Sequence, residues 1–402
     1  MNLKRLAAVN CACAAVLATV FSAGCAGRAA RGAGPSARIL VTRSLGDEAM
    51  LRAAALARSE RERGEYLWLV AGTGLQGTST ELLSDGASAV DRLDVLGVDA
   101  ALFGPAWLGF GPDRSRVLAD RARCFLLGAN ITDTVREAFG HGLMVMKTAV
   151  GLVGLAGVWP DSSDPFLRQG GVRFTGPGYA AAAILPVLRQ RCDFAGLVSA
   201  SRLDPAPPGW DIVMDAEHDS VVLYELSLTS AGILSRRLPV AIDGVTPDSG
   251  MAARLAAIAA AVDGVTLGPG PTMAATAFNR ALGRVLLDAG KADCLLFDDS
   301  LWKGGAVAPG LGRAELAAGL TEPGRWARVS LASRRLNDLV RARSLTVVRR
   351  SARTAQGGGT LTVLMPPSLA VSVLESQDAR YDLTDRMLWA IAEEFLQSGR
   401  QN

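Results

Sequence analysis

The segment Leu69-Val-Ala-Gly-Thr-Gly-Leu-Gln-Gly-Thr-Ser79 joins the end of an apolar run to a loop of Gly, Thr and Ser residues. The apolar run, residues 66–71, predicts a buried strand, and residues 72–80 predict the loop that follows it. Short apolar runs alternate on both sides with longer runs that have apolar residues at helical spacing. This alternation indicates βαβ units and therefore a parallel sheet. The flanking elements are strands predicted at 38–42 and 99–103 and helices predicted at 45–63 and 87–96.

Farther along the chain the same reasoning predicts two helices and four more strands, before a segment rich in Gly and Pro. That segment, residues 264–271, is a plausible domain boundary. The elements expected before it are strands at 147–155, 194–199, 212–214 and 221–228, a helix at 178–191 and an Ala-rich helix at 247–262. Those expected after it are helices at 273–289 and 382–397, a Gly-rich loop at 304–312 and strands at 292–297, 328–331, 344–349 and 360–365.

Length and composition are those of a folded protein with two domains of ordinary size. The chain has 402 residues, of which 49% are hydrophobic and 20% are charged. Its formal charge of +3 is small for this length and gives no electrostatic footprint for nucleic acid. We therefore expect no nucleic-acid partner.

The N-terminal segment resembles a bacterial export signal. Lys4 and Arg5 precede an apolar run at 11–24, which is too short to be a stable membrane span. The run ends in Ser22-Ala23-Gly24-Cys25, which resembles the lipobox of bacterial lipoproteins with Ser22 in place of the usual aliphatic residue. The resemblance implies lipidation at Cys25, a tether at 26–36, and a lipid-anchored location in the cell envelope, periplasmic or surface-facing. The alternative is an ordinary cleaved signal peptide.

Cleavage before a lipidated Cys25 would leave three other cysteines in the mature chain. Cys124, Cys192 and Cys294 lie far apart in or near apolar runs, and none forms a CxxC pair. An odd, widely spaced set favours buried thiols over disulfides.

Several blocks, in order, resemble the 5'-nucleotidase branch of the binuclear metallophosphoesterases. Residues 69–79 resemble the family's second block, in which a strand ends in Gly-Asp. The later blocks are residues 90–103 (VDRLDVLGVDAALF), 125–131 (FLLGANI) and 147–156 (KTAVGLVGLA), and residues 278–299 resemble part of the nucleotide-binding second domain. The resemblance covers roughly residues 38–374.

The resemblance implies an α/β (α+β) protein of two domains. The expected architecture is a four-layer αββα metallophosphoesterase-like domain followed by a 5'-nucleotidase C-terminal-like α/β domain. The expected organisation is a signal peptide at 1–25, the tether at 26–36, the first domain at 37–245, a linker helix at 246–271 and the second domain at 272–397.

The family's chemistry requires two metal ions, which polarise the phosphate and generate the attacking hydroxide. They are held mainly by His and Asp, whose imidazole and carboxylate groups suit such metals. This chain has only two histidines, His141 and His218, too few for a site of that type. Where the family has Asp-x-His the chain reads Thr42-Arg43-Ser44, the Asp of the Gly-Asp block is Thr73, and the Asn-His-Glu block is Pro105-Ala106-Trp107.

One remnant keeps several donor groups. The family's closing Gly-His-x-His block reads Ala216-Glu217-His218-Asp219 here, with Asp215 just before it. A reduced metal site at Glu217, His218 and Asp219, holding a divalent ion such as Mn or Zn, is the sharper interpretation. A polar loop is the plainer one, because successive residues of an extended chain point to opposite faces. We read His141 as a surface or turn residue.

In the family the second domain binds the nucleoside with an Asn-Gly-Gly-x-Arg segment and two aromatic rings. The corresponding segment reads Asp298-Asp299-Ser300-Leu301-Trp302-Lys303, so the Arg is replaced. Lys303 or Arg313 is a possible substitute, and Trp302 and Trp326 are candidate rings for stacking on a base. The alternative is that both tryptophans pack in the core.

The sequence thus predicts an exported lipoprotein with a 5'-nucleotidase-like scaffold, without catalytic residues or a cofactor, in a binding or structural role. One alternative is a diverged nucleotidase or phosphoesterase. Another is a nucleoside-binding module without hydrolysis. The sequence has no GxSxG elbow, P-loop or HExxH motif that would indicate other chemistry.

Overall fold

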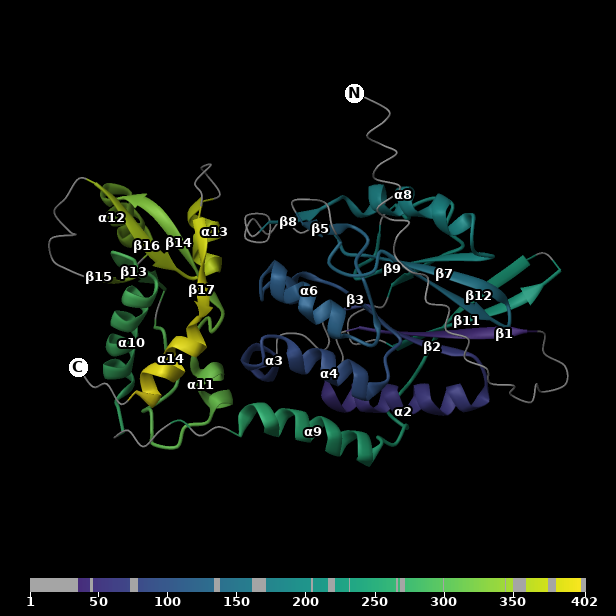
Figure 1. Ribbon diagram of the computed structural model, residues 1–402, viewed down its shortest axis with the longest axis horizontal. Coiled ribbons are helices and arrows are strands. Elements are labelled where there is room, and N and C mark those ends of the chain that lie inside the picture. Colours follow the sequence, from purple (N-terminus) through teal and green to yellow (C-terminus); the bar gives the residue numbers. More distant parts are fainter. Residues whose placement is uncertain are drawn as a thin grey trace, which may run out of the picture.

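The computed structural model describes residues 35–398 except 44–45, 73–78, 134–137, 161–170, 204, 216–220, 231, 265–266, 268–271, 299, 344, 350–358 and 375–380. Its described elements form a larger N-terminal and a smaller C-terminal part along the long axis of the molecule (Figure 1). No helix within the described residues is long and apolar enough to cross a membrane.

The first sheet contains the segments that the opening stretch predicts. Its strands follow the order β12-β11-β1-β2-β3-β4, in which β1 to β4 are parallel, β11 is antiparallel to β1, and β12 is antiparallel to β11. Alternate residues of β1 and β2 point to opposite faces, and both faces are buried. Their bounds are β1 Ser36–Thr42, β2 Tyr66–Val70, β3 Ala100–Leu102, β4 Phe125–Leu127, β11 Val221–Thr229 and β12 Gly232–Pro239.

The second sheet follows the order β10-β9-β7-β6, with β7, β9 and β10 parallel and β6 antiparallel to β7. The two sheets pack face to face through one apolar cluster, to which Ile39, Leu69 and Leu155 belong. The strands are β6 Leu143–Thr148, β7 Gly151–Val158, β9 Phe194–Ser199 and β10 Ile212–Asp215.

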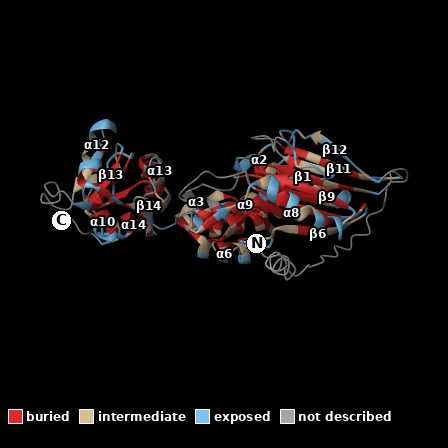
Figure 2. Cartoon of the chain, turned by 90° about the horizontal axis from the view of Figure 1, so that it is seen from above, coloured by how far each residue is buried: buried red, intermediate tan, exposed pale blue. Residues whose placement is uncertain are grey.

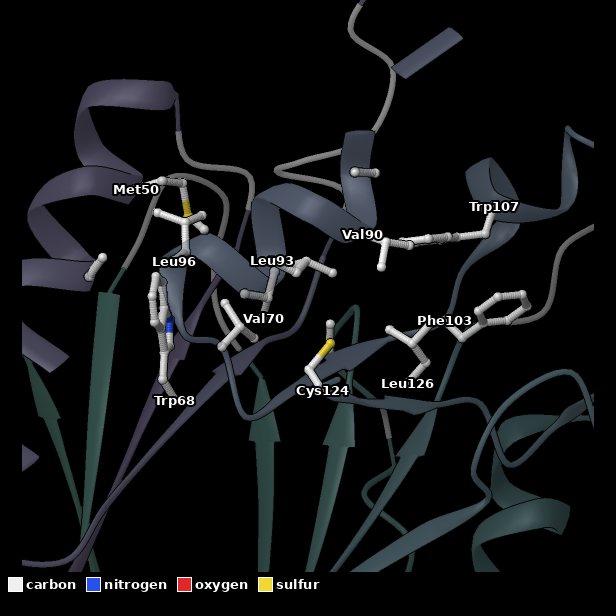
Figure 3. Close-up of a cluster of buried hydrophobic side chains, with 14 of the residues drawn as sticks. Met50, Trp68, Val70, Val90, Leu93, Leu96, Phe103, Trp107, Cys124 and Leu126 are labelled. Atoms are coloured by element: carbon white, nitrogen blue, oxygen red, sulfur yellow. The ribbon is translucent and has the colours of Figure 1, made fainter. Parts of the chain in front are cut away.

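Helices cover the outer faces of this pair of sheets. α2 (Asp47–Arg63) and α4 (Ala87–Leu96) bury Met50 and Leu93 against Trp68 of the first sheet, as Figure 3 shows. α8 (Pro177–Arg189) covers the second sheet through Ala181 and Leu188. The layer order is therefore helix, sheet, sheet, helix, which confirms the predicted αββα architecture.

Shorter elements connect these layers. α3 (Ser79–Leu83) and α5 (Pro105–Leu108) follow β2 and β3, and α6 (Pro112–Arg121) precedes β4. β5 (Ile131–Asp133) pairs with β8 (Val172–Phe174). α9 (Ser249–Asp263) is capped by Asp248, whose side chain accepts a hydrogen bond from the Met251 N–H at 3.0 Å, and it packs against α3 and α4.

The C-terminal part has its own five-stranded sheet, in the order β15-β13-β16-β14-β17. α10 and α14 pack on one face of this sheet, and α12 and α13 pack on the other. Figure 2 shows its buried residues as a separate core. The elements are α10 Ala275–Ala289, β13 Cys294–Phe297, α11 Arg313–Gly319, β14 Arg325–Ala332, α12 Ser333–Arg343, β15 Thr346–Arg349, β16 Thr360–Met365, α13 Pro367–Leu374, β17 Tyr381–Met387 and α14 Leu388–Gln397.

Two sequence predictions of single elements are wrong. Residues 147–155 were expected to form one strand, but they contain the turn between β6 and β7, where Gly151 has a φ of +124° that favours glycine. Residues 382–397 were expected to form one helix, but their first part pairs with β14 as the edge strand β17. Pairing with that edge outweighs the helical spacing of the apolar residues.

The cysteines match the expectation of thiols rather than disulfides. Cys124 and Cys294 are buried and Cys192 is half-buried, and all three are free. Burial raises the pKa of the Cys124 thiol to about 12, so this group stays protonated at neutral pH.

Candidate functional site

The candidate site lies where the carboxyl ends of β3, β4 and β7 meet between the two sheets. In parallel α/β sheets, ligands bind at this edge because the loops after the strands converge there. Contacts among Gly104 after β3, Asn130 after β4 and Trp159 after β7 bring the two sheets together at this edge.

Trp159 from the second sheet closes this edge. Its ring lies so close to Gly104 that a Cβ at Gly104 would stand 2.5–2.8 Å from three ring carbons. Asn130, which is fully buried, donates from Nδ2 to the Trp159 carbonyl at 2.7 Å and accepts from the Trp159 N–H at 2.9 Å. The same amide donates to the Thr175 carbonyl at 3.0 Å, so Asn130 fixes two loops at once.

An aromatic row continues from this point into the helix side of the first sheet. The Phe103 ring stacks on Trp107 and on Phe139, with ring centroids 6.0 Å apart in both pairs. The guanidinium of Arg116 lies 5.0 Å from the centroid of the Phe139 ring. Trp107, only 2% exposed, points into the apolar cluster of Figure 3. The segment aligned with the family's Asn-His-Glu block thus contributes packing.

The end of β1 is also occupied by internal contacts. The buried hydroxyl of Thr42 accepts a hydrogen bond from Trp68 Nε1 at 3.0 Å and lies 3.4 Å from the Leu69 carbonyl. Next to it, the Arg43 side chain lies over Gly72, where a Cβ would meet Arg43 Cγ at 2.3 Å. The Thr42 hydroxyl therefore bonds within the first sheet, and the alkyl part of the Arg43 side chain fills the space beside it.

His141 lies beside β4 and not among the residues that follow the ends of β3, β4 and β7. It forms a parallel bridge with Leu127, and its ring meets Phe125 edge-on with centroids 5.1 Å apart. Burial lowers the pKa of His141. The sequence interpretation was a surface or turn residue. The structure shows a half-buried histidine that bridges to a strand.

These residues do not fit a binuclear metal centre. Within the part of the chain that the structure describes, no group of three or more His, Cys, Asp or Glu side chains is placed to hold a metal ion. Indole rings and alkyl chains provide no donor atoms, and the carbonyl-bonded Asn130 amide and the Thr42 hydroxyl are engaged within the protein.

Several residues singled out in the sequence lie outside the described part of the chain. Thr73 and the candidate ligands Glu217, His218 and Asp219 lie outside the described residues, as does the predicted lipidation residue Cys25. For Asp215, only its backbone at the end of β10 is described.

In the C-terminal part, Trp302 and Trp326 are buried, with exposed fractions of 5% and 2%. The Trp302 ring lies between Gly304 and Gly319, where Cβ atoms would stand 2.3 and 2.1 Å from it, and Nε1 donates to the Gly305 carbonyl at 2.8 Å. Nε1 of Trp326 donates to the Glu322 carbonyl at 2.9 Å. Neither ring offers a face on which a base can stack.

The two cationic residues proposed for the same pocket are exposed or engaged in an ion pair. Lys303 is exposed, and Arg313 donates to the Glu393 carboxylate from Nε at 2.8 Å and from Nη2 at 2.6 Å. Trp326 does line a cavity of about 70 Å³ together with Thr384 and Leu388. A cavity that holds benzene measures about 150 Å³, so this space is too small for a nucleobase.

Sequence reasoning missed Trp159, Asn130 and Phe139 as residues of this edge. Asn130 lies in the quoted run FLLGANI, and Trp159 follows an apolar run directly, so both positions after strands were visible. Their partnership was not visible, because it joins strands from different sheets.

No protein-family model matches this sequence, and no curated protein matches it at a significant level. Solved structures do match it. A Staphylococcus aureus protein assigned as a 5'-nucleotidase superposes with a TM-score of 0.60 at 13% identity, over 90% of this chain and 96% of that chain. The 5'-nucleotidase precursor from Thermus thermophilus gives 0.53 at 14% identity, over 90% and 96%. The NAD nucleotidase of Haemophilus influenzae gives 0.52 at 10% identity, over 91% and 97%. The chain therefore has the two-domain fold of the 5'-nucleotidases.

Proposed function

We propose that this chain is an exported lipoprotein that uses the 5'-nucleotidase fold without metal-dependent hydrolysis, in a binding or structural role at the cell envelope. The observation that carries the proposal is the contact of Trp159 with Gly104 and Asn130 at the edge where the two sheets meet. The Trp159 ring and the Asn130 amide, which is bonded to the Trp159 backbone, occupy the carboxyl-end edge at which parallel α/β sheets bind ligands.

The chemistry of the surrounding residues supports the proposal. A binuclear phosphoesterase site needs several anionic or imidazole donors that converge on two ions. The chain has two histidines in all, and His141 packs against Phe125 beside β4. The donors that remain in sequence, at Glu217 to Asp219, lack partners from the aligned blocks at Thr42 and Pro105.

Metal content and hydrolysis, measured together, test the proposed absence of metal-dependent hydrolysis. The protein is purified from cells grown with added Mn, Zn and Fe, and its metals are determined by mass spectrometry. We expect far less than one metal ion per chain, and hydrolysis of AMP and of bis-p-nitrophenyl phosphate no faster than that of Glu217→Ala. Stoichiometric metal, lost together with activity in Glu217→Ala, would establish the alternative of a diverged phosphoesterase.

Lipid labelling tests the anchor. The full chain is expressed in bacteria supplied with labelled palmitate, alongside Cys25→Ser and the matched control Cys13→Ser, which alters a cysteine inside the apolar run. We expect label and membrane association in the unchanged chain and in Cys13→Ser, and loss of both in Cys25→Ser. Equal labelling of all three chains, or of none, contradicts lipidation at Cys25.

A further inference from the structure

Exposed apolar side chains gather at one end of the N-terminal part. Among the described residues, five large apolar side chains are exposed, and three of them are Leu152, Leu228 and Leu234, at 37%, 44% and 60%. Leu228 and Leu234 lie near the turn of the β11–β12 hairpin, where Leu228 pairs with Ile233 and Ser227 pairs with Leu234. Leu152 lies at the start of β7.

These three residues share the end at which the chain enters the fold. The Leu228 N–H donates to the Pro35 carbonyl at 3.1 Å, directly before β1. The Arg38 N–H donates to the Glu65 carbonyl, and the Ala149 N–H donates to the Glu65 side chain, so the start of β1 adjoins the turn before β7. Exposed leucines thus lie on both sheets around the point of entry.

The hairpin has the composition of a membrane-contacting segment. Residues 226–235 (LSLTSAGILS) include no charged side chain, and the exposed Arg236 and Arg237 follow them. Leu228 and Leu234 point to opposite faces of the hairpin, because they occupy positions of opposite parity in the paired register. A two-faced apolar tip suits insertion among lipid headgroups better than docking on a flat protein surface, and the arginines suit anionic lipid.

We propose that the tip of the β11–β12 hairpin rests in the headgroup region of an anionic bilayer, with Leu152 facing the same surface. This inference rests on the proposed lipid anchor at Cys25. The chain from Cys25 to Ser36 spans at most about 40 Å even when fully extended, so an anchored Cys25 keeps this end of the fold near the bilayer. Figures 1 and 2 both place the hairpin at one end of the long axis and the C-terminal sheet at the other. The molecule then stands on the membrane with its C-terminal part farthest from it.

An environment-sensitive probe in the intact protein tests this orientation. The full chain carrying Leu234→Cys is isolated from bacterial membranes, labelled with a nitrobenzoxadiazole dye and reconstituted into vesicles of phosphatidylethanolamine and phosphatidylglycerol. The matched control is Val117→Cys on α6, another exposed apolar residue, at 52%. The chain without either substitution reports the background from the half-buried Cys192.

We expect the Leu234 probe to shift its emission to the blue and to be quenched by spin-labelled lipid, and the Val117 probe to do neither. The response should weaken when phosphatidylcholine replaces the anionic lipid. Flotation on a density gradient shows whether the protein is bound to the vesicles. If it floats with them but its Leu234 probe behaves like the Val117 probe, this inference is overturned and the anchor is left intact. A protein that does not float with the vesicles overturns the anchor and this inference together. A Leu234 probe already shielded without vesicles indicates pairing of β12 with a second copy, and also overturns the inference.

Discussion

Asn130 and Trp159 are joined by two reciprocal hydrogen bonds. The Asn130 side-chain amide donates to the Trp159 carbonyl at 2.7 Å and accepts from the Trp159 N–H at 2.9 Å. The pair joins the segment that follows β4 of the first sheet to the residue that follows β7 of the second. Because Asn130 is fully buried, no water can replace these bonds without a rearrangement. The pair therefore fixes the spacing of the two sheets at the candidate site.

Replacing Asn130 with Ala should destabilise the N-terminal part. The change leaves the Trp159 N–H and the Trp159 and Thr175 carbonyls without their partner, and we expect a loss of about 3 kcal/mol in the free energy of unfolding. Urea unfolding measures it. Asn337→Ala is the control, because that half-buried amide accepts a single bond from Arg349, and its loss should cost about 1 kcal/mol or less. Equal losses in both variants would contradict a bracing role for Asn130.

Gly104→Ala should be destabilising because of Trp159. The new methyl group would stand 2.5–2.8 Å from the ring, so the ring or the strand must move, at a cost of about 1–3 kcal/mol. In the background Trp159→Leu the same substitution should cost clearly less, since the obstructing ring is gone. Gly176→Ala, which meets nothing within 4 Å, is the control. Additive losses in the double variant would show that the two residues do not interact.

The free energy of unfolding should decrease as the pH is lowered, and His141 should account for part of this decrease. Burial lowers the pKa of His141 in the folded chain below its unfolded value near 6.5. Its contribution is therefore fully present above pH 6.5 and is lost as pH falls through the lower folded pKa, because the unfolded state binds the proton more tightly. Urea unfolding from pH 7.5 to 5.0 should show a shallower decline for His141→Gln than for the unchanged chain. Parallel declines would mean that His141 titrates alike in both states.

Gly319→Ala should destabilise the C-terminal part. A Cβ there would stand 2.1 Å from the Trp302 ring, which is confined by Gly304 on the other side, so we expect a loss of about 2–3 kcal/mol. Thermal unfolding followed by tryptophan fluorescence measures it. Gly305→Ala serves as the comparison, because its Cβ would meet nothing within 4 Å although its carbonyl binds the same indole. A harmless Gly319→Ala would indicate that the Trp302 ring can leave its place, which would reopen the question of nucleoside stacking.

The sequence was sufficient for elements whose pattern is local. The predicted bounds of α4, β9 and β16 agree with the structure, because each is a periodic or apolar run between turn residues. The order of the blocks likewise led to the αββα architecture. The edge strand β17 escaped prediction, because its identity comes from β14, whose residues pair with it from far away in sequence.

For the candidate site, the sequence shows which residue types stand at the aligned blocks but not how their side chains pack. The count of two histidines and the residues Thr42 and Pro105 could be read from the sequence. The position of Trp159 over Gly104 depends on how two sheets stack, which no local pattern encodes. The same holds for Trp302, whose burial depends on Gly319 approaching from another segment.

The contact between Trp159 and Gly104 also bears on how such a protein can change over generations. A two-metal site gains nothing from one restored ligand, because binding requires several donors together. A histidine introduced near Gly104 must first displace an indole that the fold uses for stability. Building a two-metal site at this edge one ligand at a time therefore passes through variants that lose stability before the ligand set is complete. Any laboratory design of a two-metal site at this edge therefore has to begin by replacing Trp159.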